Sequence, residues 1–376
     1  MEEHDGSKTF KSIMRFLGLK KIDLYIIKKF LGTYFFAIVI IISIAVVFDI
    51  SEKVEDFIEK SAPLKAIVFD YYLNFIPYFA NLFSSLFTFV AVIFFTSKMA
   101  YNTEIIAILS SGVSFKRMMY PYFVSALIIG LLSFLLMAYV IPPANRTRLD
   151  FTYTYIKNPV RNDEKNIHRQ IEPGVFIYMQ RYNVTTDIGY KFSMEKFENG
   201  ILKSKLISDY AKWDSTKAKW SVKNYYIRDI DGINEVISKG AFIDTTLNLH
   251  PEEFKRMSNF TETMTLPQLN KFIREQKMQG ADNIVELLID KYQRVAYPFS
   301  TFILTLIGVA LSSRKVRGGI GMHIGFGLML SFSYILFMQF STMFAISGSL
   351  NPLFAVWLPN LVYSIISVFL YRIAPK

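Results

Sequence analysis

The sequence predicts a helical membrane protein with six transmembrane helices and an extracytoplasmic antiparallel β domain, similar to a jelly roll, inserted between helices three and four. The first observation is a set of long uncharged runs at both ends of the chain. The second is a polar, basic middle part, residues 145–265, in which apolar residues alternate with period two. The third is the composition, 52% hydrophobic and 19% charged, whereas soluble domains carry about 25% charged residues.

Residues 1–144 are expected to cross the membrane three times. A span requires roughly 20 apolar residues, and three stretches of this part supply them: Phe30–Phe48, a run within 71–97, and 121–141. Pro142-Pro143 is expected to close the third span. These residues form the first of three expected parts of the chain.

The flanks of the first span differ in charge. Residues 20–29 are basic and amphipathic, and they predict an interfacial helix that leads into the span. Residues 49–65 hold five acidic and three basic side chains, Asp49 among them. We expect this acidic stretch to be a loop.

Residues 145–265 are expected to form the β domain. Asn199-Gly200 and Asp231-Gly232 are turn signals between alternating segments, and the first is among the strongest hairpin signals known. About 120 residues suffice for one antiparallel sandwich or jelly roll. The expected strands are 175–179, 191–197, 201–213, 220–230 and 236–247.

Residues 266–376 are expected to carry an amphipathic helix at 268–279 and then three more spans. A run of 54 residues in this part, Gly318–Tyr371, contains no Asp, Glu, Lys or Arg. It is long enough for two spans and a tight turn. The three expected spans are 295–313, 320–346 and 353–371.

The distribution of basic residues predicts the orientation. The N-terminus, the connections 98–117 and 314–319, and the C-terminus are basic, whereas 49–65 is acidic and 346–352 is uncharged. Basic loops favour the cytoplasmic side. Both termini are therefore expected in the cytoplasm and the β domain outside it.

The connection at 98–112 is patterned like a helix. Tyr101, Ile105, Ile108 and Gly112 fall at helical spacing on one face, with Glu104 at its rim. Two interpretations fit this pattern. The helix is either a plug for a groove on another protein, or an amphipathic helix that rests on the lipid surface.

Several kinds of chemistry are missing from the sequence. It has no cysteine, no P-loop and no pair of histidines at metal-ligand spacing. None of the expected spans has an ionisable residue near its middle, although ion-coupled transporters need such groups. Any transport must therefore take its energy from a partner.

Gly321 and Gly325 form a GxxxG pair in the fifth span. Small residues at this spacing let two helices approach closely. The pair indicates either packing against another subunit or ordinary packing within one bundle.

Asn145, Arg146 and Arg148 follow the third span at its outer end. Arginine can bind phosphate oxygens in a forked geometry. The alternative is a membrane anchor or a solvated loop without a ligand.

A family resemblance is carried by the 98–117 connection. The string Met99-Ala100-x-x-x-Glu104-Ile105-x-Ala107-x-x-x-x-Gly112-x-Ser114 resembles the coupling segment of the LptF/LptG-type permeases of lipopolysaccharide export. The start of the first span, Ile22-Asp23-x-Tyr25-Ile26, is similar as well, and so is Trp357-Leu358-Pro359-Asn360. The segment Ala211-Lys212-Trp213-Asp214 resembles the LptG side of the family.

The resemblance implies a function and partners. It implies a bacterial inner-membrane permease that pairs with a homologous permease. An LptB-like ATPase dimer, which binds ATP and Mg²⁺, would drive the pair. The pair would pass lipopolysaccharide to an LptC/LptA-like periplasmic bridge. This chain would hold no cofactor and would not be an enzyme. Glu104 matches the coupling glutamate, and Ala100, Tyr101, Ile105, Ile108 and Gly112 surround it in the proposed contact.

One departure and two alternatives accompany the resemblance. Asp49 stands where some members carry a basic residue, so Arg146 and Arg148 are the candidates for lipid phosphates. A lipoprotein-release type of permease would have four spans rather than six. A membrane-anchored receptor would need no ATPase.

Overall fold

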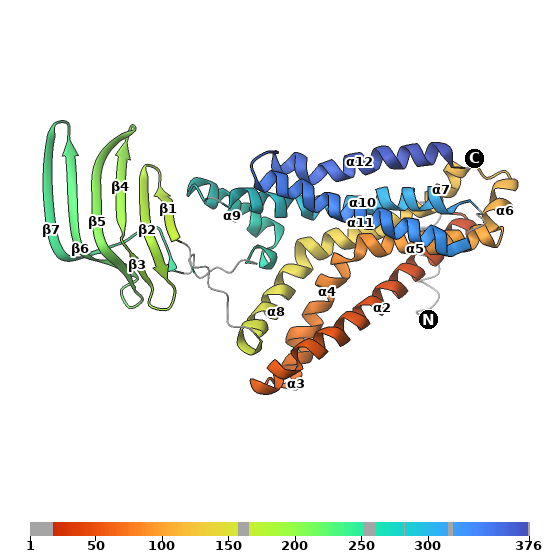
Figure 1. The fold of residues 1–376 in the computed structure, drawn as a ribbon, viewed down its shortest axis with the longest axis horizontal. Coiled ribbons are helices and arrows are strands. Elements are labelled where there is room, and N and C mark those ends of the chain that lie inside the picture. The colour runs from red at the N-terminus through yellow and green to blue at the C-terminus, as the bar shows by residue number, and fades with distance from the viewer. Residues whose placement is uncertain are drawn as a thin grey trace, which may run out of the picture. The chain divides into compact units, whose positions relative to one another are not determined.

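The computed structural model describes residues 18–156, 165–251, 254, 260–281, 283–314 and 319–374. The chain divides into two compact units, one made of 1–156 with 288–376 and the other of 157–287. The first unit is helical and the second is built around a β-sheet (Figure 1). Several basic residues used to predict orientation, among them Lys315 and Arg317, lie outside the described residues.

The helical unit contains a helix over each uncharged run and several shorter helical elements between them. They are α2 (Lys21–Glu59), α3 (Leu64–Ala66), η1 (Ile67–Tyr72), α4 (Leu73–Leu82), α5 (Ser84–Tyr101), α6 (Glu104–Ser110), α7 (Phe115–Leu135), η2 (Leu136–Val140), α8 (Ile141–Tyr155), α10 (Ile284–Ser312, whose start lies in the second unit), α11 (Gly319–Ile346) and α12 (Pro352–Ile373).

Six helical stretches among the described residues are long and apolar enough to cross a membrane. They are α2, α5, the continuous run from α7 to α8, α10, α11 and α12. The predicted class, a six-span helical membrane protein with an inserted antiparallel sheet, is therefore confirmed. The four-span alternative does not fit this count.

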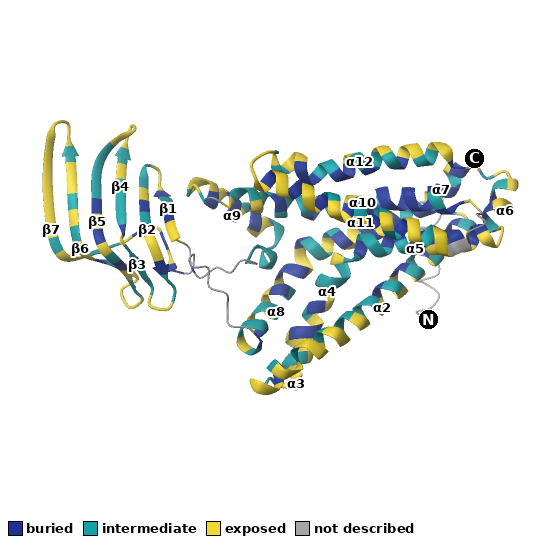
Figure 2. Ribbon diagram, in the orientation of Figure 1, coloured by how far each residue is buried: buried dark blue, intermediate teal, exposed yellow. Residues whose placement is uncertain are grey.

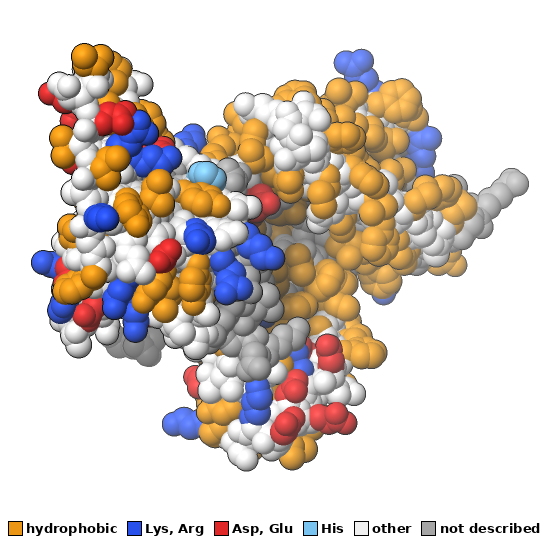
Figure 3. Space-filling model, turned by 60° about the vertical axis from the view of Figure 1, so that its left-hand side comes forward, with side chains coloured by type: hydrophobic (Ala, Val, Ile, Leu, Met, Phe, Trp, Pro, Cys, Tyr) orange, Lys and Arg blue, Asp and Glu red, His pale blue; other side chains and the backbone are white. Residues whose placement is uncertain are grey.

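The structure corrects both predicted ends of the first span. The interfacial helix and the acidic loop do not exist as separate elements, because α2 continues without a break through 39 residues as far as Glu59. Nothing in 20–59 stops a helix, since this stretch lacks proline and its one glycine, Gly32, is tolerated inside it. Figure 3 shows acidic side chains gathered at the far end of this helix, while hydrophobic side chains cover most of the helical unit.

Pro142 and Pro143 do not end the third span. The chain passes from α7 through the π-helical turn η2 directly into α8, where the two prolines occupy the first turn. Proline is tolerated there because the first amides of a helix have no intrahelical partner. Asn145, Arg146 and Arg148 consequently lie on a helix rather than on a loop.

The second span is broken at Phe83, between α4 and α5. Pro77 lies inside α4, where it cannot donate a backbone hydrogen bond. Ser133 on α7 donates to the side-chain oxygen of Asn81 at 2.6 Å, next to the break. This bond joins α4 to α7.

Glycines set the close approach of helices inside the unit. A Cβ at Gly327 on α11 would lie 2.2 Å from Cδ1 of Ile93 on α5, and one at Gly308 on α10 would lie 2.9 Å from Cγ1 of Val92. Both positions therefore require the absence of a side chain. The packed partners Ile93 and Val92 are fully buried.

The second unit contains one seven-stranded antiparallel sheet. Its strands are β1 (Lys165–Glu172), β2 (Val175–Asn183), β3 (Ile188–Tyr190), β4 (Ser193–Glu198), β5 (Ile201–Asp214), β6 (Lys219–Asp231) and β7 (Asn234–Thr245). The order is β1-β2-β3-β5-β6-β7, and β4 pairs with both β2 and β5. Thus β3 and β4 occupy the same position in the sheet, between β2 and β5. Apart from this position, neighbouring strands follow one another along the chain.

Turn chemistry explains the register of the sheet. Asn199 and Gly200 both have positive φ, 51° and 79°, in the β4–β5 turn, as predicted. Gly232, with φ of 63°, lies in the β6–β7 turn. Two-residue hairpins need such left-handed residues to match the twist of the strands.

The core of the sheet is centred on Trp220 of β6, which is fully buried. Its indole Nε1–H donates to the carbonyl of Leu249 at 2.9 Å, and its ring packs edge-on against Trp213 and Tyr182. The helix α9 (Leu266–Met278) belongs to the same unit, and the backbone N–H of Gln170 on β1 donates to the carbonyl of Gln279 just after α9 at 2.9 Å.

Candidate functional site

The segment 98–112 is not one helix. Lys98 to Tyr101 complete α5, the chain turns at Asn102-Thr103, and a separate seven-residue helix, α6, runs from Glu104 to Ser110. Thr103 adopts a left-handed conformation with φ of 62°, and Gly112 does so with φ of 86° after the end of α6. Gly112 therefore ends the helix as predicted, but the start was placed too early.

The turn at Thr103 also changes which side chains share a face. Ile105 and Ile108 are buried in the protein's own core, together with Met118 and Phe30. Tyr101 points elsewhere and is 60% exposed. The predicted apolar stripe is thus wrong as a single exposed face, because continuous helical spacing was assumed across a left-handed residue.

The outward side of α6 carries different residues from those predicted. Ile106 is 53% exposed, and Tyr101 at the end of α5 is exposed as well. Ala107 and Ser110 are exposed beside it, whereas Ala100 is buried at the end of α5. Ile106 was missed from the sequence, although a large apolar residue one position from the buried Ile105 was a usable signal. Figure 2 shows exposed and buried positions alternating in this part of the unit.

Glu104 is bound within the chain. The Tyr25 hydroxyl donates to its carboxylate at 2.7 Å, and Nζ of Lys29 lies 3.3 Å from the same oxygen. Burial of the Glu104 carboxyl raises its pKa, but the hydrogen bonds from Tyr25, Asn102 and Lys29 outweigh this and leave the pKa below its ordinary value. Glu104 is therefore ionised at neutral pH and keeps 28% of its side chain exposed.

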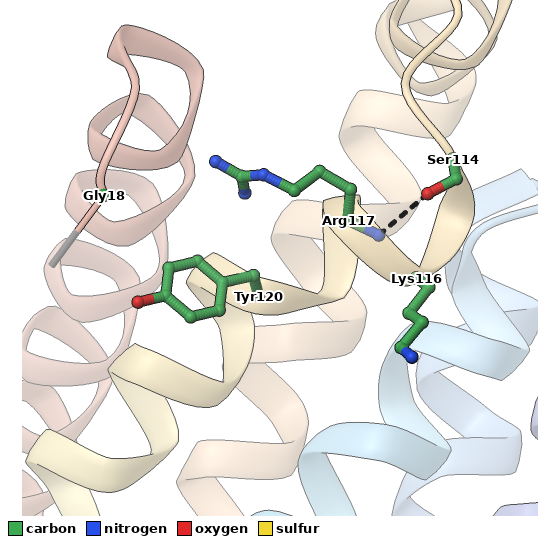
Figure 4. Close-up of a pocket in the computed structure, with 5 residues that line it drawn as sticks. All are labelled: Gly18, Ser114, Lys116, Arg117 and Tyr120. Atoms are coloured by element: carbon green, nitrogen blue, oxygen red, sulfur yellow. Dashed lines mark hydrogen bonds between the residues drawn. The ribbon is translucent and has the colours of Figure 1, made fainter.

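A second ion pair joins the same region of α2 to α7. Asp23 is fully buried, and the two terminal nitrogens of Arg117 donate to its two oxygens at 2.7 and 2.5 Å. Arg117 points toward the start of α2 and borders a pocket of about 390 Å³ with Gly18, Ser114, Lys116 and Tyr120 (Figure 4). Two neighbouring elements, α6 and α7, thus bind one end of α2.

The GxxxG pair of α11 has open space in front of it. A Cβ at Gly321 or at Gly325 would meet no atom from another element of the described residues within 4 Å. Gly130, Gly308 and Gly327 pack against other helices of the unit instead. Both GxxxG residues are therefore unused for packing within the described part of the chain.

The polar residues of α8 differ in their surroundings. Asn145 is fully buried and Arg146 is exposed. Arg148 lies over the ring of Tyr78, 5.2 Å from its centroid, and its buried Nε has no hydrogen-bond partner among the described residues. A guanidinium in this position retains the capacity to bind an anion.

Asp49 takes part in a polar cluster that sequence reasoning missed. Lys53, one turn further along α2, forms an ion pair with Asp49 and donates to the Tyr71 hydroxyl at 2.5 Å. Tyr71 and Tyr72, on the π-helical turn η1, also donate to Asp49, at 3.3 and 3.2 Å. Lys53 therefore supplies a positive charge near the far end of α2. Asp49, considered by itself, indicated that this place carries no positive charge.

The polar contacts of this region are ion pairs and hydrogen bonds that join α2 to α6 and α7. The described residues include no group of three or more His, Cys, Asp or Glu placed to hold a metal ion. Comparison with curated protein sequences gives no match. The family model described as lipopolysaccharide export system permease LptF/LptG matches residues 24–373. The chain therefore belongs to the LptF/LptG family and is a multi-pass membrane permease of lipopolysaccharide export, not itself an enzyme.

Proposed function

We propose that an LptB-like ATPase dimer docks on the outward side of α6 and drives this permease. The observation that carries the proposal is the two-sided character of α6. Its inner side chains, Ile105 and Ile108, are fixed in the core of the helical unit, and its outer side presents Ile106, which is half-exposed. A displacement of α6 is therefore transmitted to the helices around it. The ATPase, not this chain, binds ATP and Mg²⁺.

The open face of α11 supports pairing with a homologous permease. Gly321 and Gly325 let a second helix approach closely, because no atom of this chain occupies the space in front of them. In this assembly the termini and α6 face the cytoplasm of a bacterial cell, and the β domain faces the periplasm. The segment 211–214 favours the LptG member of the pair.

The periplasmic partner is a bridge protein of the LptC/LptA kind. The β domain has an apolar core around Trp220. Separation of its strands exposes this core, which then accepts acyl chains. Lipopolysaccharide phosphates are assigned to Arg148 and Arg146, with Asn145 as a supporting polar residue. The unpartnered Nε of Arg148 is the observation that supports this assignment.

Copurification tests the docking on α6. The full-length permease is extracted in mild detergent with its ATPase, either unchanged or with Ile106→Asp. The variant is expected to lose the ATPase, because a carboxylate replaces a half-exposed apolar contact. Ile233→Asp is the matched control, since Ile233 is 99% exposed in the β6–β7 turn. Stoichiometric ATPase on the Ile106→Asp protein would refute the docking surface.

A second experiment tests coupling. Glu104→Lys is expected to leave the permease inserted in the membrane while ATP hydrolysis no longer extracts lipopolysaccharide. The readout is lipid released from proteoliposomes for each ATP hydrolysed. Normal release by this variant would contradict the role of Glu104.

A further inference from the structure

The start of α2 is bound along both edges of its buried face. Ile26 and Phe30 form the middle of this face and are fully buried. With about 100° of rotation for each residue, Asp23 falls at one edge, and Tyr25 with Lys29 falls at the other. Arg117 of α7 binds the first edge, and Glu104 of α6 binds the second.

The two bonds differ in how firmly they are fixed. Asp23 is inaccessible to solvent, receives two hydrogen bonds from Arg117, and accepts a third from the backbone N–H of Lys20 at 2.7 Å. Glu104 and Lys29 keep 28% and 33% of their side chains exposed. The Asp23 side is consequently suited to act as a pivot, and the Glu104 side is the one that can transmit a displacement.

The remainder of α2 offers little resistance to such a displacement. Only 17% of its most apolar window is buried within the chain, compared with 61% for α5 and 67% for α10. A helix that is held at its two ends, here by Glu104 and by the contacts of Asp49 with η1, and is lightly packed between them tilts when one end is moved. The Glu104 contact is thus placed where a small shift of α6 has a large effect on α2.

We infer that Tyr25 and Lys29 are positioning residues that carry the movement of α6 directly into the first span, with Glu104 as their shared acceptor. This inference rests on the proposed docking of an ATPase on α6. It gives Glu104 an intramolecular role, which is separate from any contact that it makes with the ATPase. The Asp23–Arg117 pair stays closed while the Glu104 contact moves.

Charge reversal separates the two roles of Glu104. The complete permease complex is reconstituted with lipopolysaccharide in liposomes, carrying Lys29→Glu, Glu104→Lys, or both together. Each single reversal is expected to lower lipid release for each ATP by about tenfold, because it places two like charges in contact. The double reversal re-forms the pair and is expected to restore release to within about threefold of the original protein.

Lys28→Glu is the matched control. It reverses the same charge on the neighbouring residue, which is exposed, and it is expected to leave lipid release unchanged. Tyr25→Phe provides a milder variant that keeps the ring and removes only the 2.7 Å hydrogen bond to Glu104. It is expected to lower lipid release for each ATP while ATPase binding stays intact.

The outcomes distinguish this inference from the proposed function. If the ATPase stays bound and the double reversal is as defective as Glu104→Lys alone, Glu104 acts only toward the partner and the inference is overturned. Unchanged release by both Lys29→Glu and Tyr25→Phe overturns it as well. If the unaltered permease neither binds an ATPase nor releases lipid, the proposed function itself fails, whatever the variants do.

Discussion

The glycines of α11 allow a prediction in which two neighbouring positions respond in opposite ways. Gly325→Ala adds a methyl group in open space, whereas Gly327→Ala places one 2.2 Å from Cδ1 of the buried Ile93. In a helix interior, glycine is about 1 kcal/mol less favourable than alanine, so Gly325→Ala should stabilise the helical unit by about 1 kcal/mol. Gly327→Ala gains the same helix-propensity energy, but overpacking against Ile93 destabilises it by about 1–3 kcal/mol. The difference between the two variants is therefore about 1–3 kcal/mol.

Equilibrium unfolding of the purified chain in mixed detergent, followed by helical circular dichroism, measures this difference. The same variants are then tested for pairing. Gly325→Leu should lose the second permease on copurification although its fold is stable, because its side chain fills the space that the partner needs. Equal stabilities for Gly325→Ala and Gly327→Ala, or intact pairing of Gly325→Leu, would refute the reasoning.

Three further predictions concern single contacts. Arg117→Met leaves the buried Asp23 carboxylate without its partner and should destabilise the helical unit by about 3 kcal/mol; chemical denaturation measures the loss, and adding Asp23→Asn should recover part of it. Trp220→Phe removes the hydrogen bond to Leu249 and should destabilise the β domain by about 2 kcal/mol. Its melting temperature, followed by tryptophan fluorescence, should fall, and an unchanged temperature would contradict the assigned bond. The lowered pKa of Glu104 means that its bonds contribute fully above the ordinary glutamate range and are lost only as pH falls through the lower folded-state value. A spin-label distance between α2 and α6 should therefore be the same at pH 6 as at pH 7 and should change only once the pH falls below the ordinary glutamate range.

The elements that follow from local pattern were predictable, and those that depend on a single backbone conformation were not. Uncharged runs located the six spans, and Asn199-Gly200 located a hairpin, because both signals are contained in a few adjacent residues. The turn at Thr103 was invisible, since threonine rarely adopts positive φ. Tertiary contacts of α6 impose that conformation, and it moved Ile105 and Ile108 from a presumed surface into the core.

The candidate site was predictable to the same extent. Glu104 was found from the sequence because it is a lone carboxylate beside apolar residues. Its partners Tyr25 and Lys29 lie 79 and 75 residues away, so no spacing rule connects them. Lys53 was hidden for a different reason, because the stretch that contains it was interpreted as a loop and is in fact the end of α2.

The length of α2 has a consequence for how cargo leaves the bilayer. At 1.5 Å for each residue, its 39 residues extend about 58 Å, whereas the hydrocarbon layer is about 30 Å thick. Nearly half of this helix therefore lies outside the hydrocarbon layer, and the helix is unbroken where it leaves that layer. On the proposed transport path, a lipid that moves along α2 passes from the hydrocarbon layer into water while it stays in contact with one continuous helix.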